Sequence, residues 1–159
     1  QIDAAKVIGN YPYVDKTRIG IFGWSYGGFM SSNCIFQGND TFKMAIAVAP
    51  VTSWRYYDSV YTERYMQTPQ ENASGYDNNS PITHVAKLKG NFLLIHGTAD
   101  DNVHYQGAEM LVNELVKNGK QFQMMSYPNR THSINEGEGT TEHLSKLFSN
   151  KKKKVKKKR

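Results

Sequence analysis

Cysteine is nearly absent from this sequence: Cys34 is the single one among 159 residues, so no disulfide can form within the chain. There is also no H-E-x-x-H motif, no paired Cys/His spacing and no phosphate-binding glycine loop. No apolar run approaches the roughly 20 residues of a membrane helix, and the start QIDAAKVIGN lacks the segments of a signal peptide. We therefore expect no metal and no cofactor, and the residues alone leave the compartment open.

Acidic residues are in the minority, with 14 Asp and Glu against 20 Lys and Arg and a formal net charge of +6. Residues 151–159 alone hold 8 of those 20 basic residues, and the remainder of the chain is mildly acidic. A folded nucleic-acid-binding domain gathers its positive charge on one face or along a helix, not in a terminal run. We expect no nucleic-acid partner, and we interpret residues 150–159 as a basic disordered tail, either solvated or a translated artefact.

Short apolar runs alternate with segments of helical spacing. Strands are expected over Arg18–Phe22, Met44–Val48, Phe92–Ile95 and Phe122–Tyr127. Helices are expected over Phe29–Gln37, between His104 and Asn118, with Gly119 as the cap, and over Thr140–Phe148. This alternation predicts an α/β fold with a mostly parallel sheet and flanking helices. The Tyr- and Asn-rich stretch Val51–Lys89 is expected to be an excursion above the sheet edge.

A candidate nucleophile follows the first predicted strand. Gly23-Trp24-Ser25-Tyr26-Gly27 fits G-x-S-x-G, in which a serine occupies a strained turn between a strand and a helix. Side chains at Gly23 and Gly27 are expected to collide with the neighbouring strand and helix. The backbone N–H of Tyr26 is the expected oxyanion donor, and the second donor should come from a loop before this strand.

A serine hydroxyl needs a base and an orienting carboxylate, in the chain order Ser, Asp, His. Asp100 directly follows the third predicted strand, and His132 lies in the loop after the fourth. Because parallel strands present their carboxyl ends to one crevice, we expect Ser25, Asp100 and His132 to converge there as a catalytic triad.

Other acids and histidines compete for these roles. Asp101 adjoins Asp100, but neighbouring loop side chains point apart, and the pattern does not settle which one faces the histidine. His96 ends a buried strand and is interpreted as a hydrogen-bonded core histidine. The remaining histidines lie in or before helices or in the excursion: His84, His104 and His143.

Three longer segments carry a family resemblance. GWSYGG, AIAVAPVTSWRYYDSVYTERYM and LLIHGTADDNVHYQ resemble the catalytic domain of dipeptidyl peptidase IV-like enzymes in the prolyl oligopeptidase superfamily, over about Val14 to His143. The resemblance implies the C-terminal portion of an α/β-hydrolase fold, with Asp100 rather than Asp101 as the triad acid. It also implies a serine exopeptidase that releases dipeptides from free N-termini and prefers proline or alanine at the second position.

The resemblance further implies a pocket for the proline ring. Its residues would be Tyr26, Val51, Trp54, Tyr57, Tyr61 and Val103, with Asn102 binding a substrate carbonyl. The aromatic density between Trp54 and Tyr65 suits a flat apolar ring, although such clusters are more often core.

Parts of the family pattern are missing from the chain. Family members have an N-terminal propeller and earlier strands, so residues 1–149 are expected to be a partial catalytic domain whose partners include those segments. The resemblance suggests a secreted, periplasmic or membrane-anchored protein and a homodimer.

Two alternatives to a dipeptidyl peptidase stay open. One is another α/β-hydrolase, such as an acylaminoacyl peptidase or an esterase. The other is a catalytically inactive fragment or an interaction segment that binds acidic partners through its basic tail.

Overall fold

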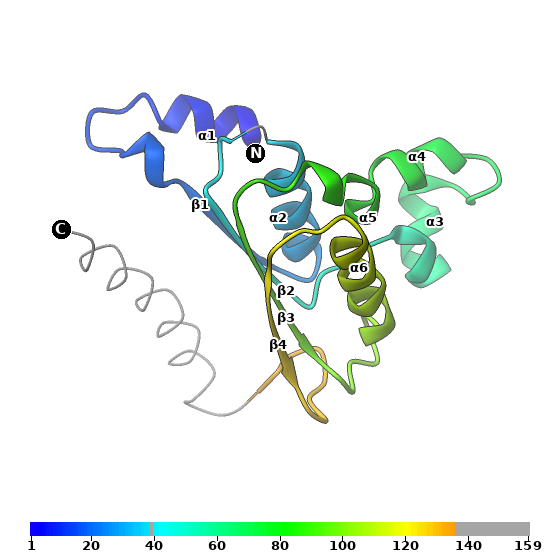
Figure 1. Cartoon of the computed structure of the whole chain (residues 1–159). Helices are drawn as coiled ribbons and strands as arrows, with labels where there is room; N and C mark the ends of the chain where they lie inside the picture. Colours follow the sequence, from blue (N-terminus) through cyan, green and yellow to red (C-terminus); the bar gives the residue numbers. More distant parts are fainter. Residues whose placement is uncertain (39, 136–159) are drawn as a thin grey trace.

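Four strands alternate with helices within residues 1–38 and 40–135, which the computed structural model describes (Figure 1). The strands are β1 (Gly20–Trp24), β2 (Met44–Val48), β3 (Asn91–Gly97) and β4 (Gln123–Tyr127). The α-helices are α1 (Ile2–Ile8), α2 (Tyr26–Gln37), α3 (Ser59–Met66), α4 (Ala73–Asn78), α5 (Pro81–His84) and α6 (Tyr105–Lys117). Three short 3₁₀ turns are Lys16–Arg18, Trp54–Tyr56 and Val85–Lys87. The helix predicted over Thr140–Phe148 and the tail over 150–159 lie outside the described residues.

The sheet is parallel throughout, in the order β1-β2-β3-β4. Phe22 is in register with Ile46, Ile46 with Leu93, and Leu94 with Met124. Successive strands are joined by segments that contain helices, as parallel pairing requires. The predicted α/β class is confirmed.

Both faces of the central strands are apolar, and alternate residues divide between them. Ala45 and Ala47 of β2 belong to the core cluster that contains residues of α2 and α6. Ile46 and Val48 belong to a second cluster on the opposite face, together with Ile134 from the loop after β4. This two-sided burial is typical of parallel strands, and it explains why β2 reads as an unbroken apolar run.

The boundaries of β1, α2, β3 and β4 differ from the sequence prediction, and those of β3 and β4 differ by only one or two residues. The first strand runs over Gly20–Trp24, because the Asp15 side chain accepts a hydrogen bond from the Thr17 backbone N–H and starts a 3₁₀ turn at Lys16–Arg18. Helix α2 begins at Tyr26, immediately after the Ser25 turn, three residues earlier than its apolar spacing indicated. By contrast, β2 has the predicted bounds, and Gly119 after α6 has the positive φ of a capping glycine, +62°.

Backbone hydrogen bonds fix the loops at the carboxyl edge of the sheet. The Ser25 N–H donates to the Val48 carbonyl at 2.8 Å, and the Ala99 N–H donates to the Arg130 carbonyl at 3.1 Å. The second bond joins the loop after β3 to the loop after β4. Backbone hydrogen bonds therefore connect the segments that carry the three triad candidates to neighbouring segments at this edge of the sheet.

The segment between β2 and β3 is not a simple connection. It contains α3, α4 and α5, and Figure 1 shows α3 and α4 projecting to one side of the sheet. Within the described part of the chain, no helix is long and apolar enough to cross a membrane.

Candidate active site

Ser25 lies on a strained turn between β1 and α2. Its φ of 57° and ψ of −117° are unfavourable for a residue with a side chain. A Cβ at Gly23 would overlap the backbone of Gly27, so the turn requires glycine at the first position of the motif. The same expectation for Gly27 is wrong, because nothing lies within 4 Å of a Cβ there; instead Gly28 approaches β2, where its Cβ would lie 2.9 Å from the Val48 carbonyl oxygen.

The N-terminus of α2 begins directly beside this serine. The N–H groups in the first turn of an α-helix have no intrahelical acceptor, and Tyr26 is the first residue of α2. The Tyr26 N–H therefore has the donor capacity that an oxyanion adjacent to Ser25 would need.

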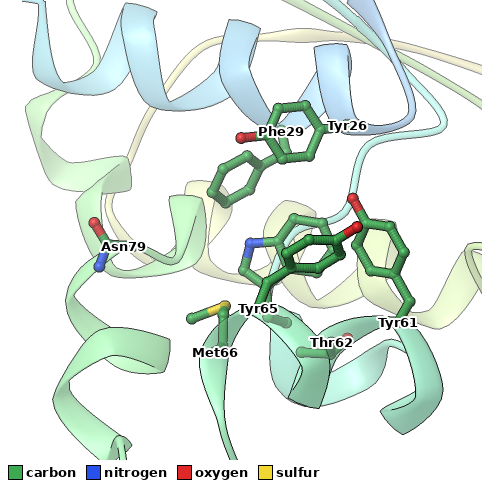
Figure 2. Close-up of a pocket in the computed structure, with 8 residues that line it drawn as sticks. Tyr26, Phe29, Tyr61, Thr62, Tyr65, Met66 and Asn79 are labelled. Atoms are coloured by element: carbon green, nitrogen blue, oxygen red, sulfur yellow. The ribbon is translucent and has the colours of Figure 1, made fainter.

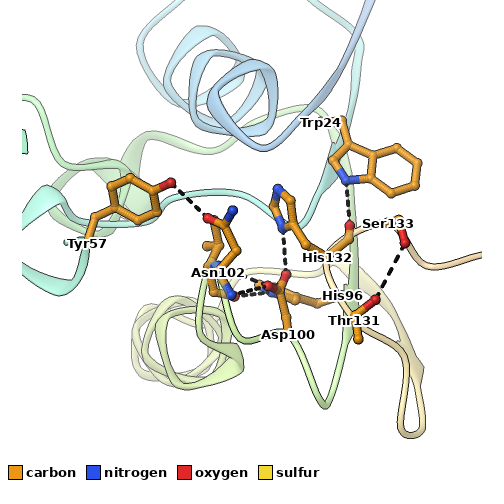
Figure 3. Close-up of polar contacts among 9 residues, drawn as sticks. Trp24, Tyr57, His96, Asp100, Asn102, Thr131, His132 and Ser133 are labelled. Carbon is orange, nitrogen blue, oxygen red and sulfur yellow. Dashed lines mark hydrogen bonds and ion pairs between the residues drawn. The ribbon is translucent and has the colours of Figure 1, made fainter. Parts of the chain in front are cut away.

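Asp100 is the most enclosed acidic group near this edge. Its side chain is fully buried, and its Oδ1 accepts hydrogen bonds from the backbone N–H groups of Asn102 at 3.0 Å and Val103 at 2.9 Å. Its Oδ2 lies 2.8 Å from His132 Nδ1 and 3.1 Å from His96 Nε2 (Figure 3). Burial alone would raise the pKa of this carboxyl, but the hydrogen bonds from His96, His132 and Asn102 outweigh burial and hold the pKa below its usual value. Asp100 is therefore an anion at neutral pH.

His132 is held from two sides. Its Nδ1 faces Asp100, so the other ring nitrogen lies on the side of the ring away from the carboxylate (Figure 3). The Trp24 indole N–H donates to the backbone carbonyl of His132 at 3.0 Å, and Ile134, two residues on, is 1% exposed in the second core cluster. Both contacts fix the loop that carries the imidazole.

Ser25 and His132, both described residues, share no hydrogen bond in this structure. The structure therefore brings Asp100 and His132 together. Ser25 lies on the turn after β1 at the same edge of the sheet, without a hydrogen bond to His132. Unliganded sites often have a long nucleophile–base contact that shortens in the substrate complex.

The competing candidates have other surroundings. Asp101 is exposed and lines a separate polar pocket with His104, while His84 is half-buried and contacts the Asn78 carbonyl. His96 is buried and hydrogen-bonded, as predicted, but its pairing with Asp100 was not foreseen. His143 lies outside the described residues.

An aromatic pocket lies between α2 and α3, and its lining includes Tyr26, the residue after Ser25. Its volume is about 460 Å³, and Figure 2 shows Tyr26 and Phe29 of α2 facing Tyr61 and Tyr65 of α3 across it. The rings of Trp54 and Tyr61 are stacked with centroids 5.8 Å apart. The complete lining is Tyr26, Phe29, Trp54, Tyr61, Thr62, Tyr65, Met66 and Asn79.

The residues expected in a proline pocket divide into three groups. Tyr26, Trp54 and Tyr61 line the aromatic pocket, as just described. Val51 and Val103 are buried behind it in one cluster with Phe29 and Trp54. Tyr57 and Asn102 line the neighbouring polar pocket, where the Tyr57 hydroxyl donates to Asn102 Oδ1 at 2.8 Å (Figure 3).

Several lining residues were missed in the sequence. Phe29 could have been found, because it lies three residues after Tyr26 on the same face of a helix. Met66 and Asn79 carry no such signal, since their place in the pocket depends on how α3 and α4 pack.

A metal site is not visible in the described part of the chain: no group of three or more His, Cys, Asp or Glu side chains there could hold an ion. The arrangement offers instead a buried carboxylate, an imidazole, a hydroxyl on a strained turn and an apolar pocket. Together these groups can perform nucleophilic acyl transfer.

Comparisons with known proteins identify the relatives of this chain. A "Probable dipeptidyl-aminopeptidase B" of Paracoccidioides brasiliensis (strain Pb18) is 54% identical over 138 residues, which cover 84% of this chain and 15% of that protein. The protein of the same name in Aspergillus terreus is 51% identical over the same shares. Dipeptidyl peptidase 4 of Porphyromonas gingivalis, a solved structure, superposes with a TM-score of 0.89 and 50% identity, over 94% of this chain and 21% of that one.

The chain thus spans about 15% of the length of the curated relatives it matches. Its match to the prolyl oligopeptidase family, peptidase family S9, extends over residues 1–158. On that match, and on the parallel sheet and the strained serine turn described above, the chain belongs to the prolyl oligopeptidase family.

Proposed function

We propose that this chain carries the catalytic Ser25, Asp100 and His132 of a serine exopeptidase that releases dipeptides from free N-termini. The observation that carries the proposal is the buried Asp100 carboxylate bonded to His132 Nδ1 at 2.8 Å, beside a serine on a strained turn. The relatives support it, because their names describe dipeptidyl peptidases.

In the proposed reaction, His132 acts first as a base. Its unprotonated Nε2 takes the proton of Ser25 Oγ as that oxygen attacks the scissile carbonyl carbon, and the Tyr26 N–H stabilises the resulting oxyanion. The imidazolium then gives this proton to the leaving amine, and an acyl-enzyme ester remains on Ser25. A water molecule, deprotonated by His132, then attacks the ester carbonyl. The acyl–oxygen bond breaks, the imidazolium returns the proton to Ser25 Oγ, and the dipeptide leaves with a free carboxyl group. Asp100 stays ionised throughout and stabilises the imidazolium.

The aromatic pocket supports a preference for proline or alanine at the second position. Tyr26, which lines the pocket, directly follows the nucleophile in the sequence. The centroid of the Trp54 ring lies 5.9 Å from that of Tyr26 and 5.8 Å from that of Tyr61. Flat apolar walls of this kind suit a pyrrolidine ring or a methyl group, neither of which requires a hydrogen-bond partner.

Asn102 supplies a polar contact for the substrate in this proposal. Its Oδ1 already accepts the Tyr57 hydroxyl, which leaves the amide N–H groups available to a substrate carbonyl. Burial, followed by the negative charge of Asp58, raises the pKa of Tyr57, so its hydroxyl remains a donor at neutral pH.

The test is hydrolysis of a Gly-Pro chromogenic substrate by the full-length protein. We expect release of the dipeptide, a loss of about 10⁴-fold or more in kcat for Ser25→Ala, and covalent labelling of Ser25 by a fluorophosphonate. Ser74→Ala is the matched control, because Ser74 is exposed on α4, and it should retain full activity.

Two outcomes would contradict the proposal in different ways. Faster turnover of N-acetylated than of free-amine substrates would indicate an acylaminoacyl peptidase. Neither turnover nor labelling by the full-length protein would indicate that the site is inactive.

A further inference from the structure

His96 is a buried histidine that the proposed reaction leaves without a role. It is the sixth residue of β3 and is 0% exposed. Its Nε2 lies 3.1 Å from Asp100 Oδ2 and 2.9 Å from the backbone carbonyl of Val103. Its Nδ1 is buried and has no hydrogen-bond partner among the described residues.

These contacts determine the protonation state of the ring. Both partners of Nε2 are acceptors, a carboxylate and a carbonyl oxygen, so Nε2 carries the hydrogen and donates to both. A proton on Nδ1 would then be a buried donor without an acceptor, which costs free energy. His96 is therefore a neutral donor at this site rather than a second base.

The other titratable group against the His96 ring is Tyr105, at the start of α6. The two rings meet edge to face with centroids 5.5 Å apart, and the Tyr105 hydroxyl is engaged with Ser126 Oγ at 2.7 Å. Tyr105 thus encloses the ring without competing for Nε2.

We infer that His96 is a positioning residue for the hydrolysis, one that fixes the Asp100 carboxylate in the orientation that His132 requires. The inference rests on the proposed function. Asp100 Oδ2 receives the N–H groups of both histidines, while Oδ1 receives those of Asn102 and Val103.

The position of His96 explains why a side chain from the strand is needed. The two backbone donors lie on the same loop as Asp100, so they move with the carboxylate if the loop moves. His96 is anchored in the sheet, and its Nε2 bridges Asp100 and the Val103 carbonyl, both of which belong to that loop. One N–H thereby ties the acid loop to the rigid β3 strand.

Three substitutions separate positioning from packing in the full-length protein. His96→Leu keeps the bulk and removes the donor. His96→Gln places an amide N–H near the position of Nε2, whereas His96→Asn places it near Nδ1, too short to reach Oδ2. The readouts are kcat and KM on the Gly-Pro substrate and active-site titration with a fluorophosphonate, which corrects for unfolded protein.

We expect His96→Leu and His96→Asn to lower kcat about tenfold to a hundredfold per titrated site, the worth of one hydrogen bond to a charged group. His96→Gln should stay within about threefold of the parent kcat. If His96→Leu does not fold, the comparison of the Gln and Asn variants decides the question alone.

Two results would overturn the inference: equal kcat in the Gln and Asn variants, or an unchanged kcat per titrated site in His96→Leu. Failure of the proposed function is distinct from both, because the parent protein itself would then neither hydrolyse the substrate nor react with the fluorophosphonate.

Discussion

The strained backbone at Ser25 depends on a missing side chain two residues earlier. Gly23 is buried against the backbone of Gly27, so the strand can turn into α2 only if position 23 has no Cβ. At Gly27, in the first turn of α2, nothing lies within 4 Å of the position that a Cβ would occupy. The two glycines of one motif therefore have different physical roles.

This difference gives a matched pair of substitutions. Gly23→Ala should destabilise the full-length protein by about 3 kcal/mol, the upper range for overpacking, because the backbone of Gly27 cannot yield. Gly27→Ala should change stability by less than about 1 kcal/mol, and in the stabilising direction, because alanine favours helix. Urea unfolding of both variants measures the effect. Equal destabilisation by the two substitutions would contradict this account of the turn.

At the scale of elements, the nucleophile turn and the histidine loop are joined by one tryptophan. Trp24 ends β1, and its indole N–H donates to the His132 carbonyl, 108 residues away in the sequence. Ile134, in the same loop, is buried in one apolar cluster with Ile46 and Ile95 of the central strands. The relative position of the hydroxyl and the imidazole thus depends on contacts between elements.

Replacement of each tryptophan by phenylalanine should separate positioning from substrate binding. Trp24→Phe removes the N–H bond to His132 and should lower kcat about fivefold to tenfold with little change in KM. Trp54→Phe reduces the wall of the aromatic pocket and should mainly raise KM, about threefold or more. Steady-state kinetics on the Gly-Pro substrate provide both constants. The same kinetic change in both variants would argue against separate roles.

Strands could be predicted where both of their faces are buried, and helices where their apolar residues recur with helical spacing. The run Met44–Val48 is apolar throughout because both faces of β2 are covered, and α6 has its apolar residues on one side. The start of β1 could not be predicted, because the Asp15 cap imposes a 3₁₀ turn that includes Arg18, and the strand begins at Gly20. Local hydrogen bonds there prevail over propensity.

The site was predictable to the extent that chemistry follows strand order. The choice of Asp100 over Asp101 rested on the family resemblance. His132 and an acid in the loop after β3 could be named because these loops follow consecutive parallel strands, which end at one edge. The pairing of His96 with Asp100 and the bond from Trp24 to His132 could not, since both depend on side-chain directions that only the packed fold defines. The contact between Ser25 and His132 remains a prediction.

At the scale of the whole molecule, β1 is an end strand of the described sheet. Phe22 in this strand is 49% exposed, and the aromatic pocket leaves Tyr65 68% exposed. The chain spans 15% of the length of its relatives, so most of the protein in those relatives lies outside the matched segment. An exposed apolar edge of this kind pairs readily with another chain.

Residues 1–159 expressed alone should therefore self-associate through β1 at micromolar concentration. Phe22→Lys should reduce this association, because a lysine on an end strand disfavours pairing with a second sheet. Val60→Lys is the matched control: Val60 is 79% exposed on α3, away from the sheet, and the substitution adds the same charge. Light scattering and sedimentation measure the difference. If both substitutions reduced association equally, net charge rather than the strand edge would control it, whereas an effect confined to Phe22→Lys would assign the contact to β1.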